Sequence, residues 1–260
     1  MPPGYHRMGR VLLVRLPREL LAYGDTIGSA WQRELGVETV LAQDGPVEGE
    51  LRRPRVKVLA GTDTTTEVVE HGVRYRFDAA EVMFATGNRT ERQRIAKEVA
   101  PGEVVVDLFA GIGYFVLPIA TQARPAVVWA VEKNPVSYRY LRENLVRNAV
   151  AVPVETLLGD NRAVALPRKA ADRLILGYLP DSRPWIGRAL EVARPDGAWL
   201  HVHLVHDVRL GPSTAARTVE EAVRFHGGEP VGPGVAREVK PYGPGRSHVV
   251  VDVRARPQPS

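Results

Sequence analysis

A glycine-containing turn is the strongest chemical signal in the sequence. Residues 104–115 read VVVDLFAGIGYF, so a buried apolar run ends at Asp107 and leads through Phe109 to Gly111. Glycine permits a left-handed backbone and close approach of a ligand, and open α/β sheets bind nucleotides at such strand ends. Val116 replaces the third glycine of a dinucleotide fingerprint, so we expect an adenosine-type ligand rather than a pyrophosphate.

Polar residues follow the next two predicted strands. Glu132 ends the strand 126–131, about 20 residues after the glycines, where an acid can accept both ribose hydroxyls; the alternative is a solvated strand end. Asp160 and Asn161 follow the strand 154–158. They can hydrogen-bond the amino group and a ring nitrogen of adenine, or they form a local Asx-turn. Three such signals at three strand ends favour S-adenosylmethionine as the cofactor.

The elements that must position these residues are alternating strands and amphipathic helices. Predicted strands cover 104–107, 126–131, 154–158, 172–176 and 198–203; predicted helices cover 90–100, 115–122, 135–148, 183–192 and 213–227. This alternation predicts an α/β fold with a parallel, doubly wound sheet. Its last strands, 236–240 and 248–254, are expected to be antiparallel.

The predicted domain boundaries follow a change in the order of the predicted strands and helices along the chain. Residues 1–84 contain short β-rich segments, a predicted helix over 19–35 and a hairpin turn at His71-Gly72, so we expect a small α+β module. The catalytic domain is expected over 85–255, and residues 256–260 form a frayed tail.

Composition narrows the chemistry further. The 260 residues include no cysteine, which excludes disulfides, thiolate metal sites, iron–sulfur clusters and cysteine nucleophiles. The net charge of +5 permits a nucleic-acid partner without requiring one, and the stretch 52–57, RRPRVK, is the densest cationic segment. No apolar run is long enough for a membrane helix and no signal-peptide pattern is present, so we expect a cytoplasmic protein without membrane contact.

At this point the sequence resembles a known group of enzymes. The glycine turn, Glu132 with the following KNP, and residues 159–162 resemble class I S-adenosylmethionine enzymes. The resemblance implies a Rossmann-like class I methyltransferase fold with a seven-stranded, mostly parallel sheet. Residues 83–92, MFATGNRTER, resemble two related tRNA-modifying families: the guanine-37 N1-methyltransferases and the wybutosine-pathway aminocarboxypropyltransferases. Gly177 stands where the methylating branch has an Asn that orients guanine, so the resemblance is closer to the aminocarboxypropyl branch.

The resemblance implies a set of cofactor contacts. The residues that it assigns to the cofactor are Ala85, Arg92, Glu132, Asp160 and Asn161. The family often has Ser at position 85, so Ala85 can contact the cofactor only through its backbone. Asp107 holds either the methionyl amine or the glycine loop. Tyr178 and His203 are the predicted catalytic residues beside the acceptor.

The implied reaction moves the 3-amino-3-carboxypropyl group to the wyosine precursor at tRNA position 37 and releases methylthioadenosine. The same γ-carbon chemistry on a small-molecule acceptor, or on the cofactor's own amine to give azetidine-2-carboxylate, stays open. So do guanine-37 N1-methylation and a non-enzymatic binding module. His201 and His203 lie on one side of a strand, but no third ligand is evident, so we predict no metal.

Overall fold

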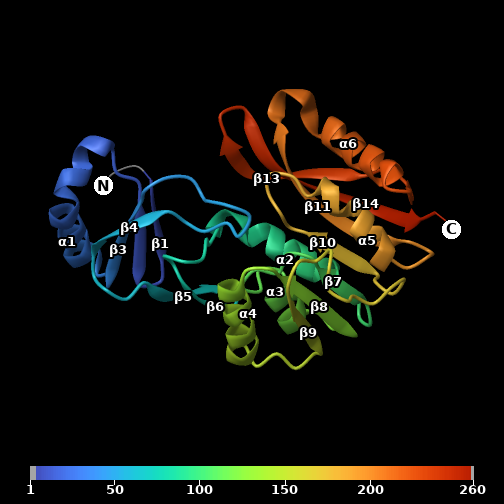
Figure 1. The fold of residues 1–260 in the computed structure, drawn as a ribbon, viewed down its shortest axis with the longest axis horizontal. Coiled ribbons are helices and arrows are strands. Elements are labelled where there is room, and N and C mark those ends of the chain that lie inside the picture. Colours follow the sequence, from blue (N-terminus) through green and yellow to red (C-terminus); the bar gives the residue numbers. More distant parts are fainter. Residues whose placement is uncertain (1–3, 259–260) are drawn as a thin grey trace.

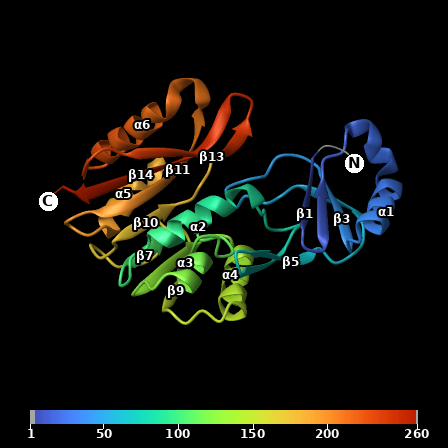
Figure 2. The ribbon, with the colours of Figure 1, turned by 180° about the vertical axis from the view of Figure 1, so that it is seen from behind.

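The computed structural model describes residues 4–258. Residues 1–3 and 259–260, at the outer ends of the predicted N-terminal module and tail, lie outside the described residues. Figures 1 and 2 show an elongated molecule with a small sheet at one end and a large sheet at the other. Within the described residues, no helix has the length and apolar character needed to cross a membrane.

The small sheet has the order β1-β2-β3-β4, with β2 and β3 parallel and the outer pairs antiparallel. Its elements are β1 (Tyr5–Met8), β2 (Val11–Val14), the 3-10 helix η1 (Arg18–Tyr23), α1 (Gly24–Leu35), β3 (Thr39–Gln43) and β4 (Val56–Ala60). The predicted helix 19–35 is therefore two pieces. The change occurs at Gly24, a residue with low helix propensity, where an added Cβ would lie 3.0 Å from the side chain of Leu59.

A two-stranded hairpin links the small sheet to the rest of the chain. It consists of β5 (Thr65–Glu70) and β6 (Val73–Asp78), and the turn residues His71 and Gly72 both have positive φ, as a tight hairpin turn requires. Its buried side chains, such as Tyr75, pack into one cluster with residues from β2, β3, α3 and α4. The hairpin thus contacts both halves of the molecule, and the boundary at residue 84 stays a prediction.

The large sheet has the order β12-β14-β11-β10-β7-β8-β9, and β13 also pairs with β14. Its strands are β7 (Val104–Asp107), β8 (Val127–Glu132), β9 (Val154–Leu158), β10 (Arg173–Leu176), β11 (Ala198–Asp207), β12 (Gly228–Pro230), β13 (Val235–Gly243) and β14 (Arg246–Pro257). Strands β7 to β11 are parallel to one another, and β14 pairs antiparallel with β11, β12 and β13. The sheet has one strand more than predicted, because β12 is only three residues long and is too short to show a strand pattern in the sequence.

Helices cover both faces of this sheet. They are η2 (Thr86–Asn88), α2 (Arg89–Glu98), α3 (Val116–Gln122), α4 (Pro135–Arg147), η3 (Arg183–Trp185), α5 (Ile186–Val192), η4 (Val208–Leu210) and α6 (Gly211–Phe225). Leu174 and Leu176 of β10 pack in the cluster of α5 and α6, whereas Ile175 packs in that of α2, α3 and α4. A strand buried on both faces must be apolar throughout, which explains why these strands could be predicted from the sequence.

Two strands run further than predicted. β11 continues to Asp207 because β14 pairs with it over ten residues, from Ala198↔Ala255 to Asp207↔Arg246. Arg256 and Pro257 are still paired with β12, so the predicted tail begins inside a strand.

Candidate active site

A cavity lies at the carboxyl ends of β7, β8 and β10, where open α/β sheets place ligands. Its walls come from the glycine turn, the loops after β8, β9 and β10, the β11–β14 pair, and the segments 50–52 and 81–92. The predicted site residues that line it are Ala85, Arg92, Phe109, Gly111, Glu132, Asp160, Asn161, Tyr178 and His203. Among the predicted site residues, Asp107 is the one that does not line the cavity.

The glycine turn has the backbone that the sequence predicts. Gly111 has φ +57° and Gly113 has φ +100°, values that favour glycine. A Cβ on Gly111 would lie 2.4 Å from the ring of Tyr114. Neither the backbone nor the surrounding space admits a side chain at Gly111, which lines the cavity.

Glu132 ties the turn to the second strand. Its Oε2 accepts from the backbone N–H of Gly111 at 2.7 Å, and its Oε1 accepts from Asn134 N at 2.6 Å. Burial raises the pKa of the Glu132 carboxyl, and these backbone donors oppose that shift. Each carboxylate oxygen has a second lone pair, so both can still accept from a ligand's hydroxyls.

Asp160 and Asn161 differ in what they offer to the cavity. Asp160 accepts from Arg162 and Lys133, and the hydrogen bonds from Arg162 hold its pKa well below the ordinary range. Asp160 also accepts from the backbone N–H of Arg162, so the local Asx-turn that was the alternative is formed. Asn161 donates from Nδ2 to Leu108 O at 2.9 Å, while its buried Oδ1 has no partner.

Asp107 is fully buried beneath the turn. Its Oδ1 accepts from Phe109 N at 3.0 Å, which caps the glycine loop, and its Oδ2 has no partner. Burial raises its pKa to about 7. Loop capping is thus present in the structure, and contact with a ligand amine stays a prediction.

Arg92 occupies an aromatic box. Its guanidinium carbon lies 4.8 Å from the centre of the Phe84 ring and 4.9 Å from that of Tyr114. Nη1 donates to the buried Glu70 at 2.6 Å, and Nη2 donates to Ala85 O at 2.9 Å. Only Nε is unpartnered. Arg92 therefore lines the cavity with its charge already paired, a partner that sequence reasoning missed because Glu70 lies in the hairpin.

Aromatic rings form the wall around the loop after β10. Phe109, Tyr178 and Trp185 contact one another with ring centroids 5.1–5.3 Å apart. Arg52 crosses from the N-terminal half, donates to Leu179 O at 2.7 Å and lies 6.0 Å from the centre of the Tyr178 ring. The N-terminal half thus holds the loop that carries this wall.

His203 has a partner that the sequence did not reveal. Its Nδ1 lies 2.9 Å from Nε2 of His248 on β14, and both rings line the cavity. The other nitrogens, His203 Nε2 and His248 Nδ1, are buried without partners. Burial lowers the pKa of both rings, that of His248 to about 4, so both are neutral at pH 7.

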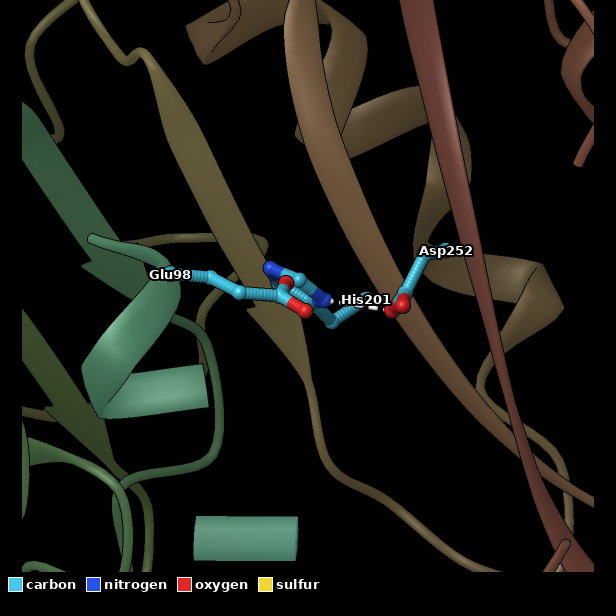
Figure 3. A group of neighbouring side chains, drawn as sticks. All are labelled: Glu98, His201 and Asp252. Atoms are coloured by element: carbon cyan, nitrogen blue, oxygen red, sulfur yellow. Dashed lines mark hydrogen bonds and ion pairs between the residues drawn. The ribbon is translucent and has the colours of Figure 1, made fainter. Parts of the chain in front are cut away.

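His201 belongs to a separate cluster. Figure 3 shows its ring between Glu98 and Asp252, three residues whose ligand atoms lie within 4.8 Å of one another. Arg173 Nη1 lies 2.8 Å from His201 Nε2. Because arginine only donates, Nε2 accepts and Nδ1–H donates to Asp252 at 2.6 Å. A metal would have to displace Arg173, so this cluster is arranged as an ion-pair network.

The cationic residues are only partly available to a polyanion. Arg55 pairs with Asp44 and Glu48. Arg94 pairs with Glu91, Glu98 and Asp252, so its charge is neutralised. Arg53 is exposed and forms no ion pair within residues 4–258.

The unpartnered polar atoms point to a ligand. Six buried side-chain N or O atoms among the described residues lack a hydrogen bond, and all but Asp107 Oδ2 belong to cavity-lining residues. They are on Asn88, Arg92, Asn161, His203 and His248. Buried polar groups are normally paired. The cavity therefore has donors and acceptors suited to a polar ligand, and the glycine turn and Glu132 fit a nucleoside such as that of S-adenosylmethionine.

Comparison with known proteins covers both parts of the chain. A model described as the TRM5/TYW2 methyltransferase domain matches residues 66–229, and one described as the TYW2 N-terminal domain matches residues 1–64. A Pyrococcus horikoshii protein named tRNA(Phe) (4-demethylwyosine(37)-C(7)) aminocarboxypropyltransferase is 38% identical over 98% of this chain and 90% of its own length.

Solved structures are similar over the same length. P. horikoshii TYW2 in complex with MeSAdo has a TM-score of 0.86 and 35% identity, covering 98% of this chain and 92% of that one. A complex of aTrm5 with tRNALeu has a TM-score of 0.81 and 26% identity, covering 97% of this chain and 72% of that one.

Proposed function

The chain belongs to the TRM5/TYW2 methyltransferase family, and on that premise we propose that it transfers the 3-amino-3-carboxypropyl group of S-adenosylmethionine to the wyosine precursor at tRNA position 37. Methylthioadenosine is the second product. The observation that carries this proposal is similarity to an aminocarboxypropyltransferase over nearly the whole of both chains. The match to the TYW2 N-terminal domain favours the same branch.

We propose the cofactor's binding residues from among those that line the cavity. Glu132 accepts the ribose hydroxyls, and Asn161 Oδ1 accepts from the adenine amino group beside Asp160. Phe109 and Gly111 shape the floor of the nucleoside site. When bound, S-adenosylmethionine supplies an electrophilic γ-carbon beside its sulfonium, and the protein supplies orientation.

Ala85 and Arg92, which line the same cavity, would hold the methionine end of the cofactor. Because Glu70 already neutralises Arg92, we assign to Arg92 a hydrogen bond from Nε rather than a free counter-charge. Orientation alone is a large part of the rate when the reacting atoms are held in line.

The acceptor side is built from flat and small groups. Tyr178 and Trp185 offer rings on which a tricyclic base can stack, and Gly177 has no side-chain amide with which to orient a guanine. Packing does not require glycine there, since a Cβ on Gly177 would lie 3.5 Å from Phe115, an ordinary contact. The lack of a side chain is consistent with an acceptor other than unmodified guanine.

The test is the identity of the nucleoside product. The protein is incubated with S-adenosylmethionine and tRNA carrying either 4-demethylwyosine or unmodified guanine at position 37, and without tRNA. We expect methylthioadenosine, and a base enlarged by the aminocarboxypropyl group, only with the first tRNA. S-adenosylhomocysteine with methylated guanine would contradict the proposal, and abundant methylthioadenosine without tRNA would indicate cyclisation instead.

A further inference from the structure

The two histidines of the cavity form a bridge between strands that run antiparallel. His203 on β11 pairs in register with Val250, and His248 on β14 pairs with Val205, so the rings are diagonal neighbours on one face of the sheet. The opposite face of β11 carries Leu200 and Val202, which pack against α5 and α6. The pair therefore faces α3 and the cavity, where Phe115 contacts His203 edge-on at 5.3 Å.

The neutral state of the two rings fixes how many N–H groups they carry, and their contact fixes where one of them lies. A neutral imidazole carries one N–H, so two neutral rings carry two. One of these lies between His203 Nδ1 and His248 Nε2. The other must be on one of the two outer nitrogens, which are the unpartnered ones. Whichever tautomer is present, this cavity-lining pair keeps one N–H donor and one lone pair without a partner.

The proposed reaction needs such a lone pair. The acceptor carbon carries one hydrogen and gains a bond to the γ-carbon as the γ-carbon–sulfur bond breaks, with its electron pair leaving on sulfur. The acceptor ring is then positively charged and must lose that hydrogen as a proton, so that the C–H electron pair restores the ring's π-system. Such a cation is a strong acid, and a weak neutral base suffices.

We propose that the His203–His248 pair accepts this proton at its outer lone pair. Transfer of the shared hydrogen between the rings then lets the other outer nitrogen release a proton, so charge does not accumulate beside the acceptor. The inference rests on the proposed function and adds His248 as a catalytic residue. Charged groups that influence the pair are Lys240, which pairs with His248 across the two strands, and Asp252 and Arg94, whose charges act on His203.

The test uses His203→Gln and His248→Gln, with tRNA that carries 4-demethylwyosine with hydrogen or deuterium on C7. In single turnovers, wild-type protein should show no isotope effect because the proton leaves after the slow step. Each variant should be slower by about 10²-fold and should show a primary isotope effect, because proton loss becomes limiting. His206→Gln is the matched control, since His206 is on the same strand but bonds to Gly211 O outside the cavity.

A second measurement does not depend on turnover. Nitrogen-15 spectra of histidine-labelled free protein should show both rings neutral at pH 7 and joined by one shared N–H. Separate rings, a charged ring, or variants that turn over without an isotope effect while binding S-adenosylmethionine normally would overturn the inference. Wild-type protein that does not modify this tRNA at all would instead contradict the proposed function.

Discussion

Nη1 of Arg92 donates to Oε2 of Glu70 at 2.6 Å, and both side chains are buried. Arg92 lies on α2 at the wall of the cavity, whereas Glu70 ends strand β5 of the hairpin. This pair joins the hairpin to the site. Because a buried charge without a partner is costly, the pair couples the stability of the two segments.

Glu70→Gln should therefore be strongly destabilising. Removing one partner of a buried ion pair costs about 3–5 kcal/mol, measured as the free energy of unfolding in urea. Glu67→Gln, in the same strand but with a partly exposed carboxylate paired to Arg74 and Arg147, should cost under about 1 kcal/mol. Equal losses of unfolding free energy in the two variants would show that water reaches the Arg92 charge.

Gly111→Ala should impair cofactor binding. The positive φ costs about 1–2 kcal/mol, and the new Cβ meets the Tyr114 ring, so the affinity for S-adenosylmethionine measured by calorimetry should fall by at least about tenfold. Gly102→Ala is the matched control, since its φ is +82° but an added Cβ meets nothing within 4 Å. It should cost stability and leave the affinity unchanged.

Asp107→Asn should change how stability depends on pH. Burial raises the folded-state pKa of Asp107 to about 7, whereas the unfolded value is about 3.9. The folded chain thus binds more protons between these values, and stability falls as pH rises from about 4 to 7. The contribution is on the order of 4 kcal/mol. Unfolding free energies at pH 5 and pH 7.5 should differ less in the variant; an unchanged difference would exclude Asp107 as its source.

Arg53→Ala should weaken tRNA binding more than Arg55→Ala. Arg53 is exposed beside cavity-lining Arg52 and has no ion pair within the described residues, whereas Arg55 is held by Asp44 and Glu48. If Arg53 contacts a phosphate, the slope of log affinity against log salt should fall by about one unit in that variant alone. An unchanged slope would place the RNA elsewhere.

The elements around the cavity were predictable because their signals are local. Apolar strands buried on both faces, the glycines of the turn, and Glu132, Asp160 and Asn161 at strand ends all follow from short stretches of chain. Parallel strands place their carboxyl ends at one edge, so these residues could be expected to converge before any coordinates were known. The short strands β1 and β12 could not be predicted, since segments of four and three residues show no alternation of apolar and polar positions.

The partners of those residues were decided by tertiary structure. Nothing near Arg92 in the sequence indicates Glu70, 22 residues away, and the pairing of His203 with His248 depends on the register of β11 against β14. That register is set by side chains along the whole of both strands. The sequence by itself thus determined most of the residues that line the cavity, whereas long-range strand pairing decided whether each charge or ring nitrogen meets a partner or the cavity.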